Sequence, residues 1–452
     1  MTTSHRTTSH ITDSRLYGAT FASTEVAAAF SDRNRVQKWF DIEAALALAQ
    51  AELGIIPQDA ADEIAAKADA ALADLDAIGR EIASTAHPLV PAIRALAALC
   101  DGDAGEYVHY GATTQDVVDT GMVLMVREAW PLLLADLGAI RERLAAGARA
   151  HRNTLMVGRT HGQHALPVTF GYKLAVWVDE IDRHLERFAE AEPRIFVGNI
   201  TGAVGTMASF GPNGLEMQRR ALSRLGLGTP RICWHSARDR VAEMAWLLVQ
   251  VAGTLGKIAN EIYNLQRPEI SEVHEPFHPG KVGSSTMPHK RNPASTELAV
   301  ALWRLVRGLL VPLTDALYQE HERDASALRV ELAAVPELVV YCGALLARMR
   351  AVVENLEPFP GRMEANADLL GGLLLSERVM LALGERVGKQ TAHEIVYEVA
   401  MAAQEKGTAF REELAKDPRV APHLGREAIG ELLDPERYLG LTGQIVDEVA
   451  GR

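Results

Sequence analysis

Residues 241–265 read VAEMAWLLVQVAGTLGKIANEIYNL, a stretch that is apolar around much of a helix circumference until Lys257. Two environments can bury such a stretch, a lipid bilayer or the interior of a helical bundle. A bilayer span needs about 20 predominantly apolar residues. Charged Glu243, Lys257 and Glu261 interrupt the stretch too often for that. We therefore expect a helix buried inside a bundle.

Helical periodicity continues on both sides of this stretch, and strand signals are scarce. Residues 294–320 and 333–356 are similarly apolar, and Ser31 can cap a helix that Gly54 and Pro57 end. One amphipathic stripe consists of Phe170, Leu174, Trp177, Ile181, Leu185 and Phe188. The pattern predicts an all-α protein. Several long apolar helices favour a bundle that buries more than one face, as a homo-oligomer does.

A chain of 452 residues is too long for one compact core, and we expect three helical domains. The polar N-terminus lacks the apolar segment of a signal peptide, so it is expected to be a disordered leader. Clusters of glycine, aspartate and proline suggest the remaining borders. The expected parts are the leader at 1–15, the N-terminal domain at 16–108, the central bundle at 109–358 and the C-terminal domain at 359–452.

The composition limits the partners and the compartment. A formal net charge of −13 argues against a nucleic-acid or membrane partner, because anionic partners require a strong basic field. An anionic small substrate is still allowed, since a few local cations can dominate a buried site. Cys100, Cys233 and Cys342 are scattered without CxxC spacing, which supports neither a disulfide framework nor a zinc site and favours the cytoplasm.

A polar loop at residues 279–293 reads PGKVGSSTMPHKRNP. Its prolines and glycines forbid a regular element, so we expect a loop between two buried helices. Lys281, His289, Lys290 and Arg291 gather cationic groups beside small hydroxyls and backbone N–H donors, a composition suited to carboxylate or phosphate. The alternative is an ordinary flexible surface loop.

Two further polar segments each place a histidine beside threonine and glycine just before a helix. They are VHYGATTQD at 108–116 and GRTHGQHALP at 158–167. Exposed N–H groups at the start of a helix favour anions. A single histidine is more often structural, but three polar segments of this kind on one helical scaffold indicate an active site.

The three segments together resemble those of the fumarase/aspartase superfamily. GSSTMPHKRNP is similar to its characteristic loop, and GRTHGQHALP and VHYGATTQD are similar to its other active-site segments in the form found in adenylosuccinate lyases. The similarity covers nearly the whole chain after the leader. It implies a homotetramer with a central helical bundle, active sites built from three subunits each, and β-elimination from a succinyl-type substrate, usually releasing fumarate.

The resemblance also implies roles for individual residues. Ser284 takes the position of the general base and His161 that of the general acid, with Glu297 orienting His161 across subunits. Removing a proton beside a carboxylate leaves a dianionic intermediate that needs electrostatic stabilisation. The residues expected to supply it, or to bind substrate, are His87, His109, Thr113, Thr114, Thr160, Lys290, Asn292, Arg238 and Arg329. No metal and no organic cofactor is implied.

The sequence departs from adenylosuccinate lyases where those enzymes hold the nucleotide. Leu16-Tyr17 replaces their Arg-Tyr pair, and LRVEL at 328–332 stands where they carry a Ser-Ser-Ala-Glu-Arg segment. The change removes several charge-assisted hydrogen bonds to phosphate, each worth about 1.5–3 kcal/mol. We therefore do not expect a nucleotide substrate.

Other segments resemble bacterial 3-carboxy-cis,cis-muconate cycloisomerases, namely WHSARD at 234–239, GGLLL at 371–375 and LDPERYLG at 433–440. Those cycloisomerases generally lack the histidine at the position of His161. Its presence indicates a leaving group that needs protonation.

We expect a lyase that cleaves a C–N bond of a small aspartate-type or succinate-type substrate, such as an N-substituted aspartate or nitrosuccinate. The alternatives are a 3-carboxy-cis,cis-muconate cycloisomerase, an adenylosuccinate lyase and a catalytically silent structural protein. Positive charge for the anionic substrate is expected in residues 281–291 and beside Arg159 and Arg238. Specificity is expected from a pocket around Trp234, His235 and Arg329.

Overall fold

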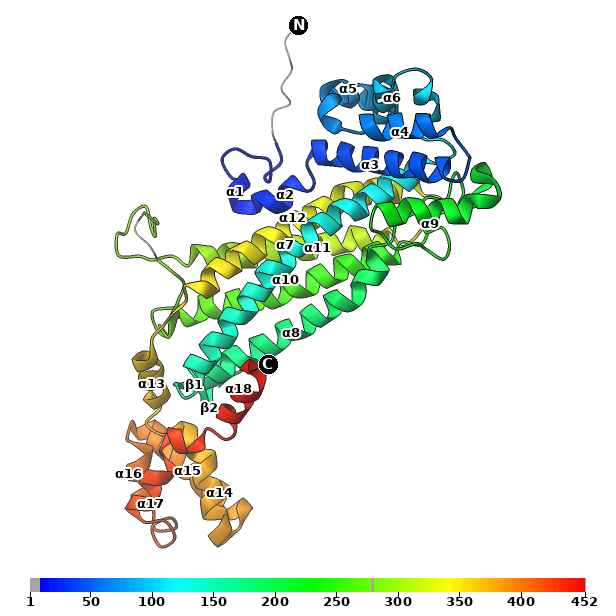
Figure 1. The fold of residues 1–452 in the computed structure, drawn as a ribbon. Helices are drawn as coiled ribbons and strands as arrows, with labels where there is room; N and C mark the ends of the chain where they lie inside the picture. Colours follow the sequence, from blue (N-terminus) through cyan, green and yellow to red (C-terminus); the bar gives the residue numbers. More distant parts are fainter. Residues whose placement is uncertain (1–8, 278–279, 452) are drawn as a thin grey trace. The chain divides into compact units, whose positions relative to one another are not determined.

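The computed structural model describes residues 9–277 and 280–451 and is built almost entirely of helices (Figure 1). The predicted all-α fold is confirmed. Among the described residues the sheets are two antiparallel pairs, β1 (Leu155–Thr160) with β2 (Gln163–Thr169) and β3 (Val273–His274) with β4 (Glu357–Pro358). Strand pairing is thus confined to short connections between helices.

Five long helices carry much of the chain: α7 (Thr114–Ala150), α8 (Phe170–Ile195), α10 (Asp239–Leu265), α11 (Ala294–Asp315) and α12 (Ala325–Glu354). Shorter helices before α7 are α1 (Gly18–Phe21), α2 (Thr24–Ala28), α3 (Asp32–Ala51), α4 (Gln58–Lys67), α5 (Leu75–Thr85) and α6 (Val90–Leu99). The others are α9 (Gly214–Arg224), α13 (Pro360–Asp368), α14 (Ser376–Val387), α15 (Lys389–Lys406), α16 (Phe410–Lys416), α17 (Arg426–Leu432) and α18 (Thr442–Ala450).

The described chain forms two compact units. Unit 1 contains the residues up to Gly138, then Arg183–Gly256 and Leu298–Arg348, and unit 2 contains Ala139–Asp182, Lys257–Glu297 and the residues from Met349 onward. Each border falls inside one of the five long helices, so all five contribute to both units. By contrast, the domain borders expected at 108 and 358 were placed at helix-breaking residues. The division into three domains stays a prediction.

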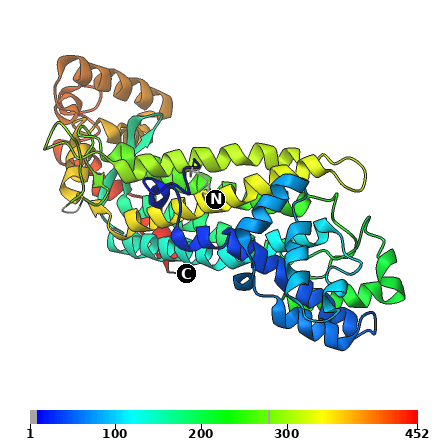
Figure 2. The same ribbon diagram turned by 90° about the horizontal axis from the view of Figure 1, so that it is seen from above.

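The long helices lie side by side in unit 1 (Figures 1 and 2). Glycine lets α10 approach α11 closely, because a Cβ on Gly256 would lie 2.7 Å from Cγ of Trp303. Helices α10 and α12 are long and apolar enough to cross a membrane by length and composition alone. However, 61% and 67% of their most apolar windows are buried inside the protein. This burial supports the bundle predicted from residues 241–265.

Helix α3 begins where the sequence predicts. The Oγ of Ser31 accepts a hydrogen bond from the N–H of Asn34 at 3.3 Å, as a helix cap does. The helix ends at Ala51, and Gly54 then adopts a φ of 68°, a left-handed conformation that glycine permits.

The expected leader at 1–15 is described from residue 9 onward. Residues 9–15 consist mainly of turns, and Nε2 of His10 lies 2.9 Å from Oε1 of Glu337. Residues 1–8 lie outside the described residues.

A buried ion-pair network in unit 1 centres on Arg238. Its guanidinium donates to the two carboxylate oxygens of Asp119 at 2.7 and 3.0 Å and to Oε1 of Glu331 at 3.0 Å. These side chains are at most 4% exposed, and the Trp234 ring lies 4.9 Å from the guanidinium carbon. The expectation that Arg238 binds substrate is not supported, because two carboxylates of its own unit enclose and neutralise it.

Replacing Arg238 by methionine tests this network. Arg238→Met leaves Asp119 and Glu331 buried without a cation, so we expect the free energy of unfolding to fall by about 3–5 kcal/mol. Arg231 is exposed, so Arg231→Met is the matched control. We expect this control to change the free energy of unfolding by less than about 0.5 kcal/mol. Urea unfolding followed by circular dichroism measures both. Equal stability of the two variants would show that the network does not hold unit 1 together.

Candidate active site

His161 lies in the turn of the β1–β2 hairpin. Thr160 pairs with Gln163, so His161 and Gly162 form a two-residue turn, with φ values of 51° and 76°. Such turns require positive φ at both central residues to match the twist of the strands. The imidazole is exposed at this turn, whereas the sequence analysis expected it directly before a helix. That expectation is wrong, since all of β2 separates His161 from α8.

Arg159 fixes the same hairpin. Its guanidinium forms a bidentate pair with Glu272, at 2.7 and 2.8 Å, and Asn366 donates to the same carboxylate at 2.8 Å. The Glu272 side chain is fully buried. Arg159 therefore orients β1 and does not supply free positive charge for a substrate.

The polar loop has no regular element in residues 280–293, as predicted, and Pro279 lies outside the described residues. The Oγ of Ser284 accepts hydrogen bonds from the N–H groups of Thr286 and Met287 at 3.3 and 3.0 Å. Two backbone dipoles therefore point at the atom expected to act as the base. Charge-assisted bonds of this kind strengthen when the oxygen loses its proton.

Glu275 anchors both ends of this loop. Its carboxylate accepts from Nζ of Lys281 at 2.6 Å, from the N–H groups of Ser295 and Thr296 at 3.0 and 2.8 Å, and from Oγ1 of Thr296 at 3.0 Å. The two N–H groups belong to the first turn of α11, where a negative charge is favourable. Glu275 is only 3% exposed, so the loop between Lys281 and α11 is anchored to a carboxylate in the interior of the protein.

Much of the positive charge expected from the sequence is already paired. Lys281, Arg159 and Arg238 each contact a carboxylate in their own unit. By contrast, Lys290 and Arg329 are exposed, and no ion pair involves them among the residues that the structure describes. The cationic groups open to a substrate are therefore fewer than composition suggested.

In unit 1 the structure joins His87 to the start of α7. Nε2 of His87 lies 3.4 Å from Oγ1 of Thr114, while Nδ1 accepts from the N–H groups of Leu89 and Val90 at 3.3 and 3.0 Å. Since Nδ1 is an acceptor, Nε2 carries the proton and donates toward Thr114. The imidazole is thereby oriented toward Thr114, and substrate binding by His87 stays a prediction.

His109 lies nearby in the sequence, with a left-handed φ of 63°. Its Nδ1 lies 2.7 Å from Oε1 of Glu43, which is 1% exposed. Burial lowers the pKa of His109, but the charge and hydrogen bond of Glu43 and the charge of Asp116 outweigh it, so the net pKa is raised. The contact with Glu43 therefore favours the protonated form of His109.

Asp116 connects three segments of unit 1. Its carboxylate accepts from the N–H groups of Thr113, Thr201 and Gly202 at 3.1, 2.9 and 2.9 Å, and Nε2 of His235 lies 3.0 Å away. Asp116 is fully buried and His235 is 1% exposed. His235, like the 2% exposed Trp234, is therefore a core residue and not part of an open specificity pocket.

The candidate residues fall into two groups. His87, His109, Thr113, Thr114, Arg238 and Arg329 belong to unit 1, whereas Thr160, His161, Ser284, Lys290, Asn292 and Glu297 belong to unit 2. Within the described part of one chain, no hydrogen bond joins His161 to Ser284 or to Glu297. The expected bond between His161 and Glu297 crosses subunits and stays a prediction.

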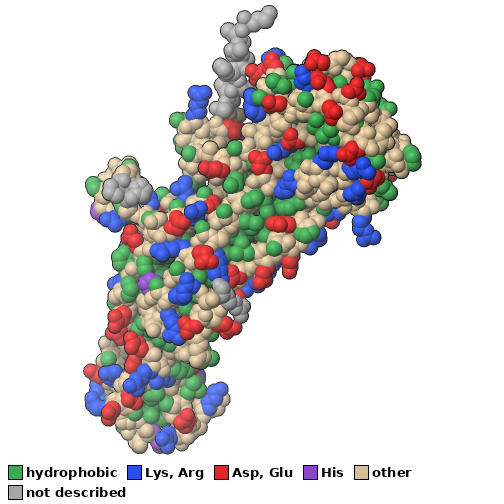
Figure 3. All heavy atoms as spheres, viewed as in Figure 1, with side chains coloured by type: hydrophobic (Ala, Val, Ile, Leu, Met, Phe, Trp, Pro, Cys, Tyr) green, Lys and Arg blue, Asp and Glu red, His purple; other side chains and the backbone are tan. Residues whose placement is uncertain are grey.

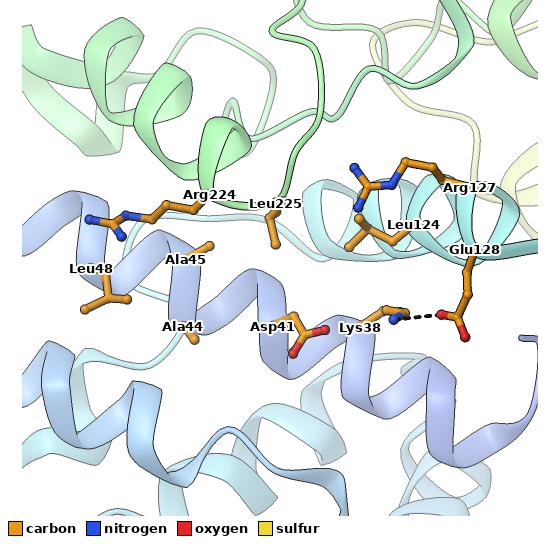
Figure 4. A pocket seen from close by; sticks show the side chains of 10 residues that line it. All are labelled: Lys38, Asp41, Ala44, Ala45, Leu48, Leu124, Arg127, Glu128, Arg224 and Leu225. Atoms are coloured by element: carbon orange, nitrogen blue, oxygen red, sulfur yellow. Dashed lines mark ion pairs between the residues drawn. The ribbon is translucent and has the colours of Figure 1, made fainter. Parts of the chain in front are cut away.

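Unit 1 also contains a cavity of about 660 Å³ that other residues line (Figure 4). Charged side chains line it beside alanines and leucines, and Lys38 pairs with Glu128 at 2.8 Å. None of the predicted site residues lines this cavity. Among the described residues, no cluster of three or more His, Cys, Asp or Glu side chains could hold a metal ion.

Four carboxylates that organise the candidate site were not predicted from the sequence: Glu43, Asp116, Glu272 and Glu275. One of them had a readable signal, because Asp116 stands three residues after Thr113 in a pattern typical of helix starts. Glu43, Glu272 and Glu275 contact residues that are distant in the sequence or beyond a loop. No local spacing in the sequence therefore reveals these contacts.

Comparisons with known proteins agree with this geometry. A family profile described as "Lyase" matches residues 19–308, and one described as "Adenylosuccinate lyase C-terminus" matches residues 372–449. An N-acetyl-S-(2-succino)cysteine lyase from Dickeya dadantii is 47% identical, over 98% of this chain and 97% of its own length. An adenylosuccinate lyase from Methanocaldococcus jannaschii is 42% identical, over 95% and 94% of the two chains.

One solved structure extends the comparison to the fold. The 3-carboxy-cis,cis-muconate lactonizing enzyme of Pseudomonas putida matches with a TM-score of 0.92 at 37% identity, over 97% of this chain and 98% of that chain. The matches thus cover both the helical fold and the three polar segments. The chain belongs to the fumarase/aspartase superfamily of lyases.

Proposed function

We propose that the protein cleaves the C–S bond of a succinyl thioether and releases fumarate and a thiol. The observation that carries this proposal is the 47% identity, over nearly the full length, to a lyase named for N-acetyl-S-(2-succino)cysteine. The preference for a C–N bond drawn from the sequence lacks such support. The elimination itself is the reaction type implied by the polar segments.

In this proposal, Ser284 removes a proton from the carbon beside a substrate carboxylate. The N–H groups of Thr286 and Met287 stabilise the oxyanion of Ser284 before transfer. The electron pair left on the carbon is delocalised into the carboxylate, where Lys290 and Asn292 stabilise it. That pair then forms the C=C bond as the C–S bond breaks and the sulfur departs with its electrons.

A sulfur leaving group changes what is required of His161. A thiol has an ordinary pKa of about 8.5, so sulfur can depart as a thiolate without being protonated first. An amine nitrogen must carry an additional proton before it departs as a neutral amine, because its anion is far too basic to leave. Protonation by His161 therefore contributes less for a thiol than for an amine. The exposed turn of the hairpin presents the imidazole for this proton transfer.

We further propose a homotetramer whose active sites draw on three subunits. The membership of the chain in the fumarase/aspartase superfamily supports this arrangement. Apolar side chains are also exposed on long helices, among them Trp246 of α10 at 53% and Leu305 of α11 at 40%. Hydrophobic and charged side chains both reach the face shown in Figure 3. Contact with another subunit would remove the apolar surface of these side chains from water. The free Cys100, Cys233 and Cys342 favour the cytoplasm.

A substrate panel tests the proposed bond. We expect N-acetyl-S-(2-succino)cysteine to be cleaved with the highest kcat/KM. The reaction is monitored by the ultraviolet absorbance of fumarate and by titration of the released thiol. N-substituted aspartates, adenylosuccinate and 3-carboxy-cis,cis-muconate complete the panel. Faster turnover of an N-substituted aspartate would restore the C–N lyase, and turnover of the muconate alone would make the protein a cycloisomerase.

The role of His161 is tested with His161→Asn. Asparagine tolerates positive φ, so the hairpin turn is kept. With an N-substituted aspartate we expect kcat to fall by about 10²–10⁴-fold, as for loss of a general acid, but with the thioether by roughly tenfold. Steady-state kinetics on both substrates measure the difference. Equal losses would contradict assistance to the leaving group.

The base is tested by comparing neighbouring serines. Ser284→Ala removes the hydroxyl that receives two N–H groups, and we expect kcat to fall by about 10²–10⁴-fold. Ser285→Ala removes an exposed neighbour and is the matched control, with a change of less than tenfold. Both are measured with the substrate that the panel identifies, together with the oligomeric state. The reverse order would reassign the base to Ser285.

A further inference from the structure

A buried network in unit 2 holds the hairpin that carries His161. Glu272 is at its centre, with a fully buried side chain that binds Arg159 through both carboxylate oxygens at 2.7 and 2.8 Å. Asn366 of α13 is 3% exposed and donates at 2.8 Å both to Oε1 of Glu272 and to the carbonyl of Ile270. The proposed elimination gives none of these side chains a role.

The backbone of Glu272 is fixed as firmly as its side chain. Its N–H donates to the carbonyl of Leu265 at the end of α10, and its carbonyl accepts from the N–H of Phe359 at the start of α13, both at 2.9 Å. Helix α13 in turn packs against β1. Glu272 is therefore held by two helices on the backbone side, and its ion pair fixes where Arg159 of β1 lies.

An irregularity in the hairpin precedes Arg159. The register of the β1–β2 pair shifts between Val157 and Arg159, and Gly158 lies at the shift. A Cβ on Gly158 would lie 2.9 Å from a carbonyl oxygen of β2, so glycine permits the close approach of the two strands. Such shifts redirect the side chains beside them. Arg159 then stands two residues before His161, so the ion pair acts on the last part of β1 before the turn.

The turn itself needs such an anchor. A two-stranded hairpin is marginally stable by itself, and the turn at His161 is exposed. Proton transfer requires the imidazole within hydrogen-bond distance of the leaving group, and a misplacement of about 1 Å can lower a rate by about 10²-fold. A guanidinium that binds a carboxylate through two parallel N–H···O bonds fixes direction as well as distance. The pair of Arg159 with Glu272 has this geometry.

We propose that Glu272 is a positioning residue for the elimination: through Arg159 it sets the place of His161 relative to the leaving group. This assignment rests on the proposed function, in which His161 is the general acid. Glu272 contacts neither the substrate nor the transferred proton, and its effect on the rate passes entirely through the hairpin. Asn366 extends the network to α13, so the C-terminal part of the chain contributes to the placement of the acid.

A double-mutant cycle tests this assignment with any substrate that the panel shows to be cleaved. Glu272→Gln keeps the size of the side chain but removes the charge that binds the guanidinium. We expect kcat to fall by about 10–100-fold with an amine leaving group and by about threefold with a thiol. In a His161→Asn background the same substitution should change kcat by less than about 1.5-fold, because the acid that it positions is already absent. A residue that only stabilises the fold would lower kcat by the same factor in both backgrounds.

Two further variants accompany the cycle. Arg159→Lys keeps a positive charge beside the buried carboxylate but cannot form the paired hydrogen bonds, so it tests the network even where Glu272→Gln does not fold. We expect its loss in kcat to depend on His161 in the same way. Asp447→Asn is the matched control, because Asp447 is exposed and binds Arg152 of the same unit through both carboxylate oxygens at 2.7 Å. This control should change kcat by less than about twofold.

Hydrogen exchange of the backbone amides in residues 158–164 provides a second readout. Glu272→Gln and Arg159→Lys should speed exchange there, whereas Asp447→Asn should not. Unchanged exchange in the first two variants, or an equal fall in kcat with and without His161, would overturn the proposal. Exchange requires no substrate, and the cycle uses whichever substrate is cleaved. Failure of the thioether panel therefore does not alter either outcome.

Discussion

The buried carboxylate of Asp116 is the constraint on which the organisation of unit 1 depends. It accepts from the N–H groups of Thr113, Thr201 and Gly202 and contacts Nε2 of His235, so it joins the start of α7 to two irregular segments. An ionised carboxylate with no exposure is stable only when donors surround it in this way. The same contacts fix the backbone at Thr113 and Thr114, where the substrate is proposed to bind, and hold the His235 ring in the core. The packing of unit 1 and the geometry of this candidate substrate-binding segment therefore depend on one buried side chain.

In unit 2, two other buried carboxylates hold segments that carry candidate site residues. Glu272 fixes the hairpin that carries His161 through Arg159, and Glu275 fixes the polar loop that carries Ser284 through Lys281 and the first turn of α11. The polar loop has no regular element, so its backbone groups are not satisfied by a helix or a sheet. Glu275 accepts from the N–H groups of Ser295 and Thr296, where the loop meets α11. The segments that carry His161 and Ser284 are thus held by buried carboxylates from inside the protein.

The sequence predicted the helical fold well because helical periodicity and capping are local. Ser31 and the stripe from Phe170 to Phe188 are examples, since each is visible within a few turns. The histidine segments were recognised by composition, but the β1–β2 hairpin was not, because two short strands joined at His161-Gly162 give little alternation to read. The pairing of Arg238 was also not visible in the sequence. Its partners, Asp119 and Glu331, are far away in the sequence, so only the tertiary structure shows that its charge is already neutralised.

The ion pairs inside the protein also limit which cationic side chains can bind a substrate. An acidic chain with a net charge of −13 cannot attract an anion by its overall field, so recognition depends on individual groups. Arg159, Arg238 and Lys281 are paired with carboxylates, as His109 is with Glu43, which leaves Lys290, Arg291 and Arg329 among the cations discussed. A small dicarboxylate needs few such contacts, whereas a nucleotide needs a further set for its phosphate. The ion pairs that stabilise the two units therefore leave few cationic side chains of each chain open to an anion, and Lys290 and Arg329 are two of them.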